Sequence, residues 1–300
     1  MIILEKNTSM DGLAPDMLAA ASTITPALPR KKIPGELPAD KYTTEKITWM
    51  KTWTPHLFSF RTTRYQGYRF TPGQFARLGV YRDDGEKGPR YIWRAYSIVS
   101  ANYDEYLEFY SIVVPDGEFT TKLAQLKVGD ELFIEKMNYG FLTTDRFEQG
   151  KDLWMLSSGT GLAPFISVLY DMPTWEQYDR LILVHSVRHE NELAYKDTIE
   201  SFKTHEFFGD YCKDNPDKLV YVPIVTRESI PGTLNERITS AIADGKLEQF
   251  AGVKLDQERS RIMICGNPEM VDDIRKQLTD KGYAVSRRGQ PGHMAVENYW

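Results

Sequence analysis

The sequence predicts two domains of different architecture: an antiparallel β-barrel, then an α/β domain with a doubly wound parallel sheet. The chain has 300 residues, 41% of them hydrophobic and 26% charged, a globular composition long enough for two domains. Between Glu45 and Lys136, short apolar segments alternate with turn residues, as in antiparallel strands. After Gly150, longer apolar strands alternate with helical periods, which favours a parallel sheet covered on both faces.

Residues 1–40 are predicted to be an N-terminal extension outside both domains. Five prolines interrupt short alanine and polar runs there, so we expect this segment to be flexible. The opening Met-Ile-Ile-Leu is followed by charged residues rather than an apolar core, so we expect no secretion signal. No stretch approaches 18 apolar residues, so no transmembrane helix and no membrane insertion are expected.

Residues 41–146 are assigned to the barrel. Its strands are expected at 47–53, 57–62, 74–80, 92–99, 106–114 and 131–135. Gly73, Asp84-Gly85, Asp116-Gly117 and Gly129-Asp130 mark turns between them, and one helix is expected near 120–126. The domain boundary is placed between Thr144 and Gly150.

Residues 147–300 are assigned to the α/β domain. Parallel strands are expected at 153–156, 181–187, 219–225 and 261–265, and helices near 164–170, 192–202, 234–243 and 268–281. Each strand is followed by a helical period, which is typical of βαβ units.

Charge and cysteine content exclude several classes of protein. A net charge of −5 gives no general attraction to nucleic acid, so no nucleic-acid partner is expected. Cys212 and Cys265 are too few for a disulfide framework, which fits a reducing cytoplasm. None of the five histidines has zinc or haem spacing, so no metal site is predicted.

A first candidate site is Arg94-Ala95-Tyr96-Ser97, at the end of an apolar strand. It offers a cation for a phosphate, an aromatic plate for a flat ring and a hydroxyl donor beside that ring, which together suit a flavin nucleotide. The segment 115–121 then leads into a helix start that could bind a phosphate through backbone N–H groups. The alternatives are an ordinary barrel surface with a half-buried tyrosine and a simple capped helix.

A second candidate site is Gly159-Thr160-Gly161, a turn that lets backbone N–H groups approach a second nucleotide closely. It is not a complete Gly-x-Gly-x-x-Gly motif, because position 164 is proline. Arg188, Arg227 and Cys265-Gly266 also follow predicted strands, and parallel sheets bind ligands at these carboxyl ends. The alternatives are solvated surface arginines and a small buried cysteine without chemistry.

These motifs, together with Cys265-Gly266-Asn267-Pro268 and the ending Glu297-Asn298-Tyr299-Trp300, identify a resemblance. Over roughly residues 43–300 the chain resembles the bacterial ferredoxin/flavodoxin–NADP(+) reductases. The resemblance implies a barrel that binds FAD, an α/β domain that binds NADP(H), and electron exchange with a ferredoxin or flavodoxin.

The resemblance also implies roles for particular residues. Around FAD it places Arg94 on the pyrophosphate, Tyr96 on the isoalloxazine, Ser97 near the flavin N5, Tyr110, Ser111 and Val113 around the flavin, and Gly117, Phe119 and Thr120 at the pyrophosphate. Tyr299 would stack on the opposite face of the ring as a displaceable gate, and Trp300 would reach the adenine half.

For NADP(H), the resemblance implies contacts from Thr160, Gly161 and Gly266 and a 2′-phosphate cluster of Arg188, Arg227 and Arg237. Cys265 and Glu297, with Ser97, would surround the atoms that exchange hydride, as positioning groups rather than covalent catalysts. Arg275, Lys281, Arg287 and Arg288, with Lys122 and Lys127, are candidates for a basic surface that receives an acidic carrier, although such charges are usually only solvated. Two alternatives stay open: a general NADPH diaphorase or oxygenase reductase, and a non-catalytic nucleotide-binding module.

Overall fold

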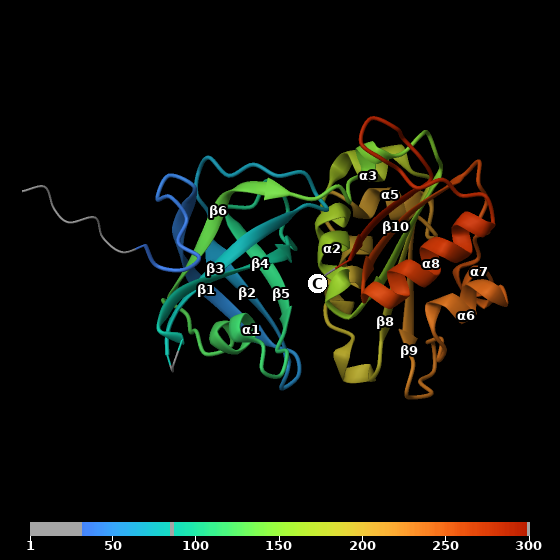
Figure 1. Cartoon of the computed structure of the whole chain (residues 1–300). Coiled ribbons are helices and arrows are strands. Elements are labelled where there is room, and N and C mark those ends of the chain that lie inside the picture. The colour runs from blue at the N-terminus through green and yellow to red at the C-terminus, as the bar shows by residue number, and fades with distance from the viewer. Residues whose placement is uncertain (1–31, 85–86, 299–300) are drawn as a thin grey trace, which may run out of the picture. The chain divides into compact units, whose positions relative to one another are not determined.

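The computed structural model describes residues 32–84 and 87–298 (Figure 1). Its strands form a six-stranded antiparallel sheet followed by a five-stranded parallel sheet, so the predicted fold class is confirmed. Both sheets belong to the compact unit that begins at Ile33. No helix in the described ranges is long and apolar enough to cross a membrane.

The first sheet has the strand order β4-β3-β6-β1-β2-β5. Its strands are β1 Tyr42–Thr52, β2 Leu57–Thr63, β3 Phe75–Asp83, β4 Pro89–Ser97, β5 Tyr106–Ile112 and β6 Glu131–Tyr139. The two edge strands meet where Ile98, just after β4, bridges Phe109 of β5, which closes the sheet into a barrel. Alternate side chains fill the interior, among them Phe60, Leu78 and Ile134. α1 Glu118–Leu123 packs Phe119 and Leu123 against this core.

The second sheet has the strand order β11-β10-β7-β8-β9. Its strands are β7 Asp152–Ser158, β8 Arg180–Val187, β9 Leu219–Val225, β10 Ser260–Gly266 and β11 Met294–Asn298. The sequence did not predict β11. It is only five residues long and contains Glu297 and Asn298, so its apolar run is too short to indicate a strand, and pairing with β10 defines it.

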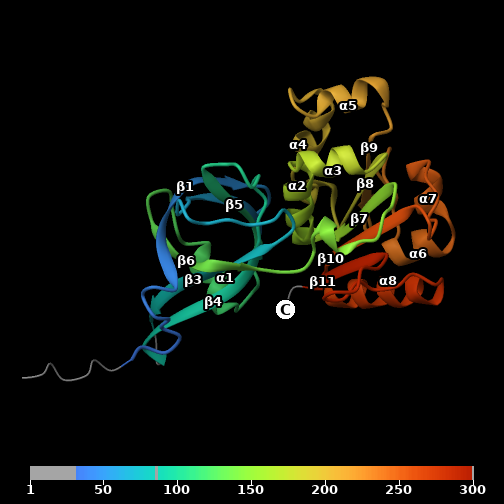
Figure 2. The same cartoon turned by 90° about the horizontal axis from the view of Figure 1, so that it is seen from above.

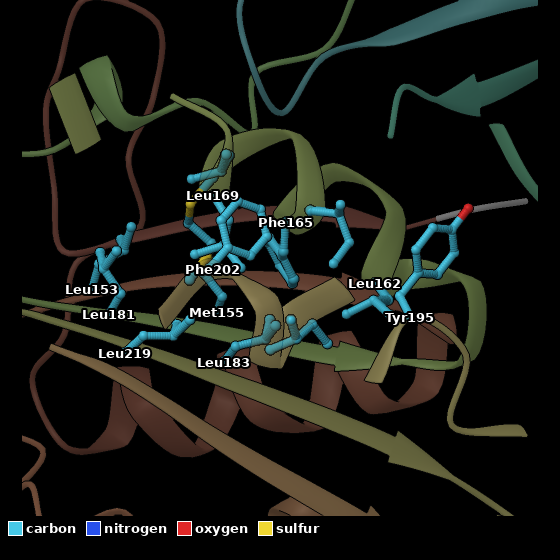
Figure 3. Packing of buried hydrophobic residues seen from close by; sticks show 14 of the residues in the cluster. Leu153, Met155, Leu162, Phe165, Leu169, Leu181, Leu183, Tyr195, Phe202 and Leu219 are labelled. Atoms are coloured by element: carbon cyan, nitrogen blue, oxygen red, sulfur yellow. The ribbon is translucent and has the colours of Figure 1, made fainter. Parts of the chain in front are cut away.

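Helices cover both faces of the parallel sheet, as Figure 2 shows. One face carries α2 Ala163–Leu169, α3 Met172–Gln177, α4 Lys196–Ser201 and α5 Gly209–Asp214, and the other carries α6 Ile238–Ala243, α7 Lys246–Ala251 and α8 Pro268–Asp280. Neighbouring residues of β7 alternate between the two cores: Met155 packs under the first group and Trp154 under the second. Figure 3 shows Phe165 and Leu169 of α2 lying over Met155 and Leu183. Burial on both faces explains the continuous apolar strands.

The helix predicted at 192–202 is shorter than expected. A short 3-10 turn, Glu190–Glu192, precedes it, and α4 begins only at Lys196. Tyr195 has φ 62°, a left-handed conformation that interrupts the helix. Helices α3, α5 and α7 were not predicted, because each has only six residues and hence less than two turns of periodicity.

Tyr195 joins the two sheets through a buried polar network. Its hydroxyl lies 2.5 Å from Ser59 Oγ of β2 and donates to Glu108 Oε1 of β5 at 2.8 Å. The other Glu108 oxygen accepts from Arg61 Nε at 2.7 Å. In Figure 3 the Tyr195 hydroxyl points away from the other labelled side chains of the core.

The end of the predicted N-terminal extension contacts the barrel. Trp93 Nε1 donates to the Gly35 carbonyl at 2.9 Å, and Tyr91 N–H donates to the Pro34 carbonyl at 2.9 Å. Residues 1–31 lie outside the described residues, so the division of the chain at residue 40 stays a prediction.

Candidate functional site

A pocket of about 420 Å³ lies at the end of the barrel that faces the glycine turn after β7, a volume typical of small-molecule sites. Its walls come from β3, β4, β5 and α1 of the barrel, from the turn and helix after β7, and from β11. The lining residues are Phe75, Arg94, Ala95, Tyr96, Ser97, Tyr110, Ser111, Ile112, Val114, Gly117, Glu118, Phe119, Thr120, Thr160, Ala163, Glu297 and Asn298. Both sheets therefore contribute to one site.

The Tyr96 ring is held in a fixed orientation. Its hydroxyl lies 2.9 Å from Ser111 Oγ, and its ring centroid lies 5.4 Å from that of Phe119 and 6.4 Å from that of Phe109. Burial raises the pKa of the Tyr96 hydroxyl to about 12, so it stays protonated at neutral pH. The ring is thus a rigid, uncharged plate in the pocket wall.

Two features at the pocket favour an anion. Arg94 is exposed and donates to the neighbouring Trp93 carbonyl at 2.8 Å, and no carboxylate in the described residues pairs with it. The start of α1 at Gly117 has no side-chain cap, so its first-turn N–H groups lack side-chain acceptors. The Thr120 hydroxyl accepts from Val114 N–H at 3.1 Å and donates to the Val114 carbonyl at 3.4 Å, which leaves the backbone N–H as the donor that Thr120 can offer a ligand. Together these donors can hold a pyrophosphate.

The turn after β7 requires glycine because two backbone segments almost touch. A Cβ on Gly161 would lie 2.4 Å from the Cys265 carbonyl oxygen. A Cβ on Gly266, whose φ is +138°, would lie 2.3 Å from Ser158 Oγ. This contact brings the carboxyl ends of β7 and β10 together, with Thr160 at the pocket.

His185 supports this turn from below. Its Nε2 lies 3.2 Å from the Gly159 carbonyl, and the side chain is completely buried. Burial lowers the pKa of His185 to about 4, so the imidazole is neutral near pH 7 and donates Nε2–H to that carbonyl. No role for His185 was predicted, because a histidine inside a strand belongs to no recognisable motif.

Glu297 and Cys265 are register partners on β11 and β10. Glu297 lines the pocket, and its Oε2 is buried without a hydrogen-bond partner in the described residues. Desolvation raises the pKa of Glu297 to about 8. Cys265 is fully buried in the core beneath the turn and does not line the pocket. Of the pair, only the carboxyl is placed to touch a ligand.

Arg188, Arg227 and Arg237 lie at a second place, at the carboxyl ends of β8 and β9 and at the start of α6. All three are exposed, and no ion pair to any of them occurs among residues 32–84 and 87–298. Arg227 N–H donates to the Arg188 carbonyl at 3.0 Å, so the two loops are directly joined. The arrangement offers free guanidinium groups to an anion.

Comparison with known proteins identifies the family. Residues 155–276 match the family described as "Oxidoreductase NAD-binding domain". A ferredoxin–NADP reductase of Pseudomonas aeruginosa is 44% identical over 257 residues, which cover 85% of this chain and 96% of that protein. The flavodoxin/ferredoxin–NADP reductase of Escherichia coli is 35% identical over 260 residues, covering 86% and 99%. The chain belongs to the ferredoxin/flavodoxin–NADP reductase family.

A solved structure supports the same assignment. The ferredoxin NADP(+) reductase of Neisseria gonorrhoeae, with bound FAD and NADP, has 39% sequence identity and a TM-score of 0.77. The match covers 87% of this chain and 99% of that chain. The predicted resemblance is thereby confirmed.

Ten of the predicted site residues of this reductase line the pocket: Arg94, Tyr96, Ser97, Tyr110, Ser111, Gly117, Phe119, Thr120, Thr160 and Glu297. Gly161 and Gly266 form the adjoining turn. Val113 packs on the barrel core, and its neighbour Val114 lines the pocket instead. Tyr299 and Trp300 lie outside the described residues.

The pocket is also lined by seven residues that were not predicted as site residues: Phe75, Ala95, Ile112, Val114, Glu118, Ala163 and Asn298. Phe75 is the antiparallel partner of Ser97 and stacks on Tyr139 with centroids 5.8 Å apart. Knowing the β3–β4 register would have revealed it, but register is a long-range property that one strand's sequence does not carry.

Proposed function

We propose that this reductase binds FAD in the pocket, transfers hydride between NADPH and FAD, and exchanges single electrons with a ferredoxin or flavodoxin. The observation that carries the proposal is that one pocket is lined both by the barrel residues around Tyr96 and by Thr160 and Glu297 of the parallel sheet. When bound, FAD supplies the chemistry that links a two-electron donor to a one-electron carrier. The protein supplies binding and orientation.

The residues of the barrel fit FAD. The fixed Tyr96 ring provides a plate for a flat ring system, and Ser97 stands next to it on β4. Arg94 and the uncapped N–H groups after Gly117 provide donors for the pyrophosphate. We therefore assign these residues, with Ser111, to FAD binding.

Glu297 fits the nicotinamide end of the pocket. Its unpartnered Oε2 can accept a hydrogen bond from a ligand or hold a proton, since its pKa is raised to about 8. We assign Glu297 to orienting the nicotinamide, with Thr160 and the glycine turn on the same side. Cys265 then acts through packing beneath the turn.

Arg188 and Arg227 are assigned to the 2′-phosphate of NADP(H), with Arg237 nearby on α6. Guanidinium groups suit a phosphate dianion, and NADH has no such group to offer. The carrier is proposed from the names of the relatives, which act on ferredoxin or flavodoxin. A cytoplasmic location is proposed because neither cysteine is in a disulfide.

Anaerobic spectroscopy tests this function. The purified protein is mixed with equal amounts of NADPH or NADH while flavin absorbance is followed, and ferredoxin or flavodoxin is then added. We expect rapid bleaching by NADPH, slower bleaching by NADH, and reoxidation by the carrier in one-electron steps. A folded protein that does not retain FAD, or flavin that neither coenzyme reduces, would refute the proposal.

A further inference from the structure

The loops that follow β8 and β9 are joined by backbone hydrogen bonds and by the side chain of Glu228, which bonds to His189 and Glu190. We propose that Glu228, assisted by His189 and Glu192, is a positioning residue. It fixes the spacing of Arg188 and Arg227 before the coenzyme binds and so determines the preference for NADP(H) over NAD(H). This inference rests on the assignment of the two arginines to the 2′-phosphate.

Glu228 connects the two loops with both of its oxygens. Oε1 accepts from His189 Nδ1 at 2.9 Å, and Oε2 accepts from Glu190 N–H at 2.8 Å. Glu228 follows Arg227, and its partners His189 and Glu190 are the two residues that follow Arg188. The carboxylate thus fixes the spacing of the two arginine backbones.

Glu192 braces the first loop from within. Its Oε2 accepts from Arg188 N–H at 2.9 Å and from His189 N–H at 3.2 Å. The backbones of the two loops are also bonded, from Thr226 N–H to the Val187 carbonyl and from Arg227 N–H to the Arg188 carbonyl, both at 3.0 Å. The backbone of Arg188 is therefore held from two sides.

The carboxylates of Glu192 and Glu228 do not pair with Arg188 or Arg227, so both guanidinium groups can bind a phosphate. Glu192 and Glu228 are bound by N–H groups and by the His189 ring, while no ion pair to Arg188 or Arg227 occurs in the described part of the chain. Hydrogen bonds from Glu190 N–H and His189 lower the pKa of Glu228, which keeps it ionised as an acceptor. An acid that paired with an arginine instead would compete with the phosphate.

Electrostatics and positioning make opposite predictions for Glu228. If the carboxylate acted only through its charge, its removal would strengthen binding of the 2′-phosphate, because a nearby negative charge repels an anion. If the Glu228 carboxylate positions the two arginines, its removal weakens binding of the 2′-phosphate despite the more favourable charge. If the His189–Glu228 pair had no role, its removal would leave the affinity for the 2′-phosphate unchanged, since surface pairs contribute little.

Glu228→Gln tests the inference, with Glu190→Gln in the neighbouring loop as the matched control: it also removes one negative charge but keeps the Glu190 backbone N–H donor. Calorimetry on the FAD-loaded protein measures the dissociation constants of NADP(+), of NAD(+) and of the fragment 2′-phospho-AMP. We expect Glu228→Gln to bind NADP(+) and the fragment about 5- to 10-fold more weakly, with NAD(+) unchanged. Glu190→Gln should bind them equally or slightly more tightly.

Two further variants make the result decisive. Arg227→Ala tests the site itself, and in the double variant with Glu228→Gln the losses should not add, because the carboxylate acts through the arginine. His189→Ala should reproduce the weakening if Glu228→Gln proves too unstable to purify. If Arg227→Ala weakens NADP(+) but Glu228→Gln and His189→Ala do not, the positioning role is refuted and the assigned function stands. If Arg227→Ala also has no effect, the 2′-phosphate assignment fails together with the inference.

Discussion

The flavin pocket and the arginine loops recognise their ligands in different ways. In the pocket, the Tyr96 ring packs at a tilt against Phe119 and edge to face against Phe109, and Ser111 fixes the tyrosine hydroxyl. In the loops, Arg188 and Arg227 are exposed, and hydrogen bonds fix only the backbone beneath them.

This difference suits a resident cofactor and an exchangeable coenzyme. An enclosed aromatic wall binds through buried area, which favours long residence. Exposed guanidinium groups bind mainly through charge and in contact with water, which limits the strength of each contact and permits rapid release. The glycine turn connects the two regions, because it carries Thr160 into the pocket and its Gly159 carbonyl is bonded to His185 of β8, the strand that leads to Arg188.

The largest effect is expected at this connection. Gly161→Ala would push a Cβ to 2.4 Å from the Cys265 carbonyl oxygen, so the turn must move and we expect a loss of about 3 kcal/mol in the free energy of unfolding. Gly159→Ala is the control in the same turn: its φ is +52°, nothing lies within 4 Å, and about 1 kcal/mol is expected. Urea unfolding of both variants measures the difference. Equal losses would mean that the close approach to β10 is unimportant.

The next effect is expected in the pocket. Arg94→Ala removes a charge-assisted contact to the pyrophosphate and should weaken FAD binding about 10- to 100-fold. Flavin released on dialysis, measured by fluorescence, reports the loss. Arg77→Ala, which removes another barrel arginine that pairs with Glu135 at 3.1 Å, should retain FAD. If Arg94→Ala retains FAD equally well, another group holds the pyrophosphate.

A smaller and more selective effect is expected in the loops. Arg227→Ala should raise the KM for NADPH about 10-fold and leave NADH turnover unchanged, since only NADPH has the 2′-phosphate. Steady-state kinetics with both coenzymes measure the split. Arg275→Ala, an exposed arginine on α8, serves as the control. A similar loss for both coenzymes would place Arg227 outside the 2′-phosphate site.

A pH dependence is expected at Glu297. Its pKa is raised to about 8 in the folded protein and is ordinary when unfolded, so between about pH 4.5 and 8 the folded state holds the extra proton and stability falls as pH rises. The slope for one proton is at most about 1.4 kcal/mol per pH unit. Glu297→Gln has no titrating carboxyl at this position and so lacks this pH dependence. The difference between its melting temperature and that of the parent protein should therefore grow from pH 5 to pH 8, in favour of the variant. A constant difference across this range would contradict the buried carboxyl.

The tail forms a separate prediction. Tyr299 was predicted to stack on the flavin ring and Trp300 to reach the adenine half of FAD, and removing both should tighten binding of NADP(H) at the nicotinamide end and slow turnover as product release becomes limiting. Coenzyme titration and stopped-flow reduction measure these changes. Unchanged affinities and turnover with an unchanged flavin spectrum would show that the tail does not cover the ring.

Local patterns predicted the fold more completely than the site. β9 was predicted to the residue because Leu219–Val225 is one uninterrupted apolar run between polar segments. The Arg94 and Gly159 motifs were found because the chemistry lies within a few consecutive residues. The turn at Tyr195 was not found, since a left-handed tyrosine is stabilised by Ser59 and Glu108, far away in sequence. Phe75, His185 and Glu228 were missed for the same reason: each acquires its role from a partner on another strand or loop.

The Tyr195 network has a consequence for how the molecule melts. If the barrel separated from the parallel sheet, the Tyr195 hydroxyl and the Glu108 carboxylate would lose each other, and the apolar surface around them would meet water. Loss of a buried hydrogen bond to a charged group costs about 1.5–3 kcal/mol, in addition to the exposed area. This cost opposes the unfolding of one half alone, so we expect the two domains to melt together in a single calorimetric peak.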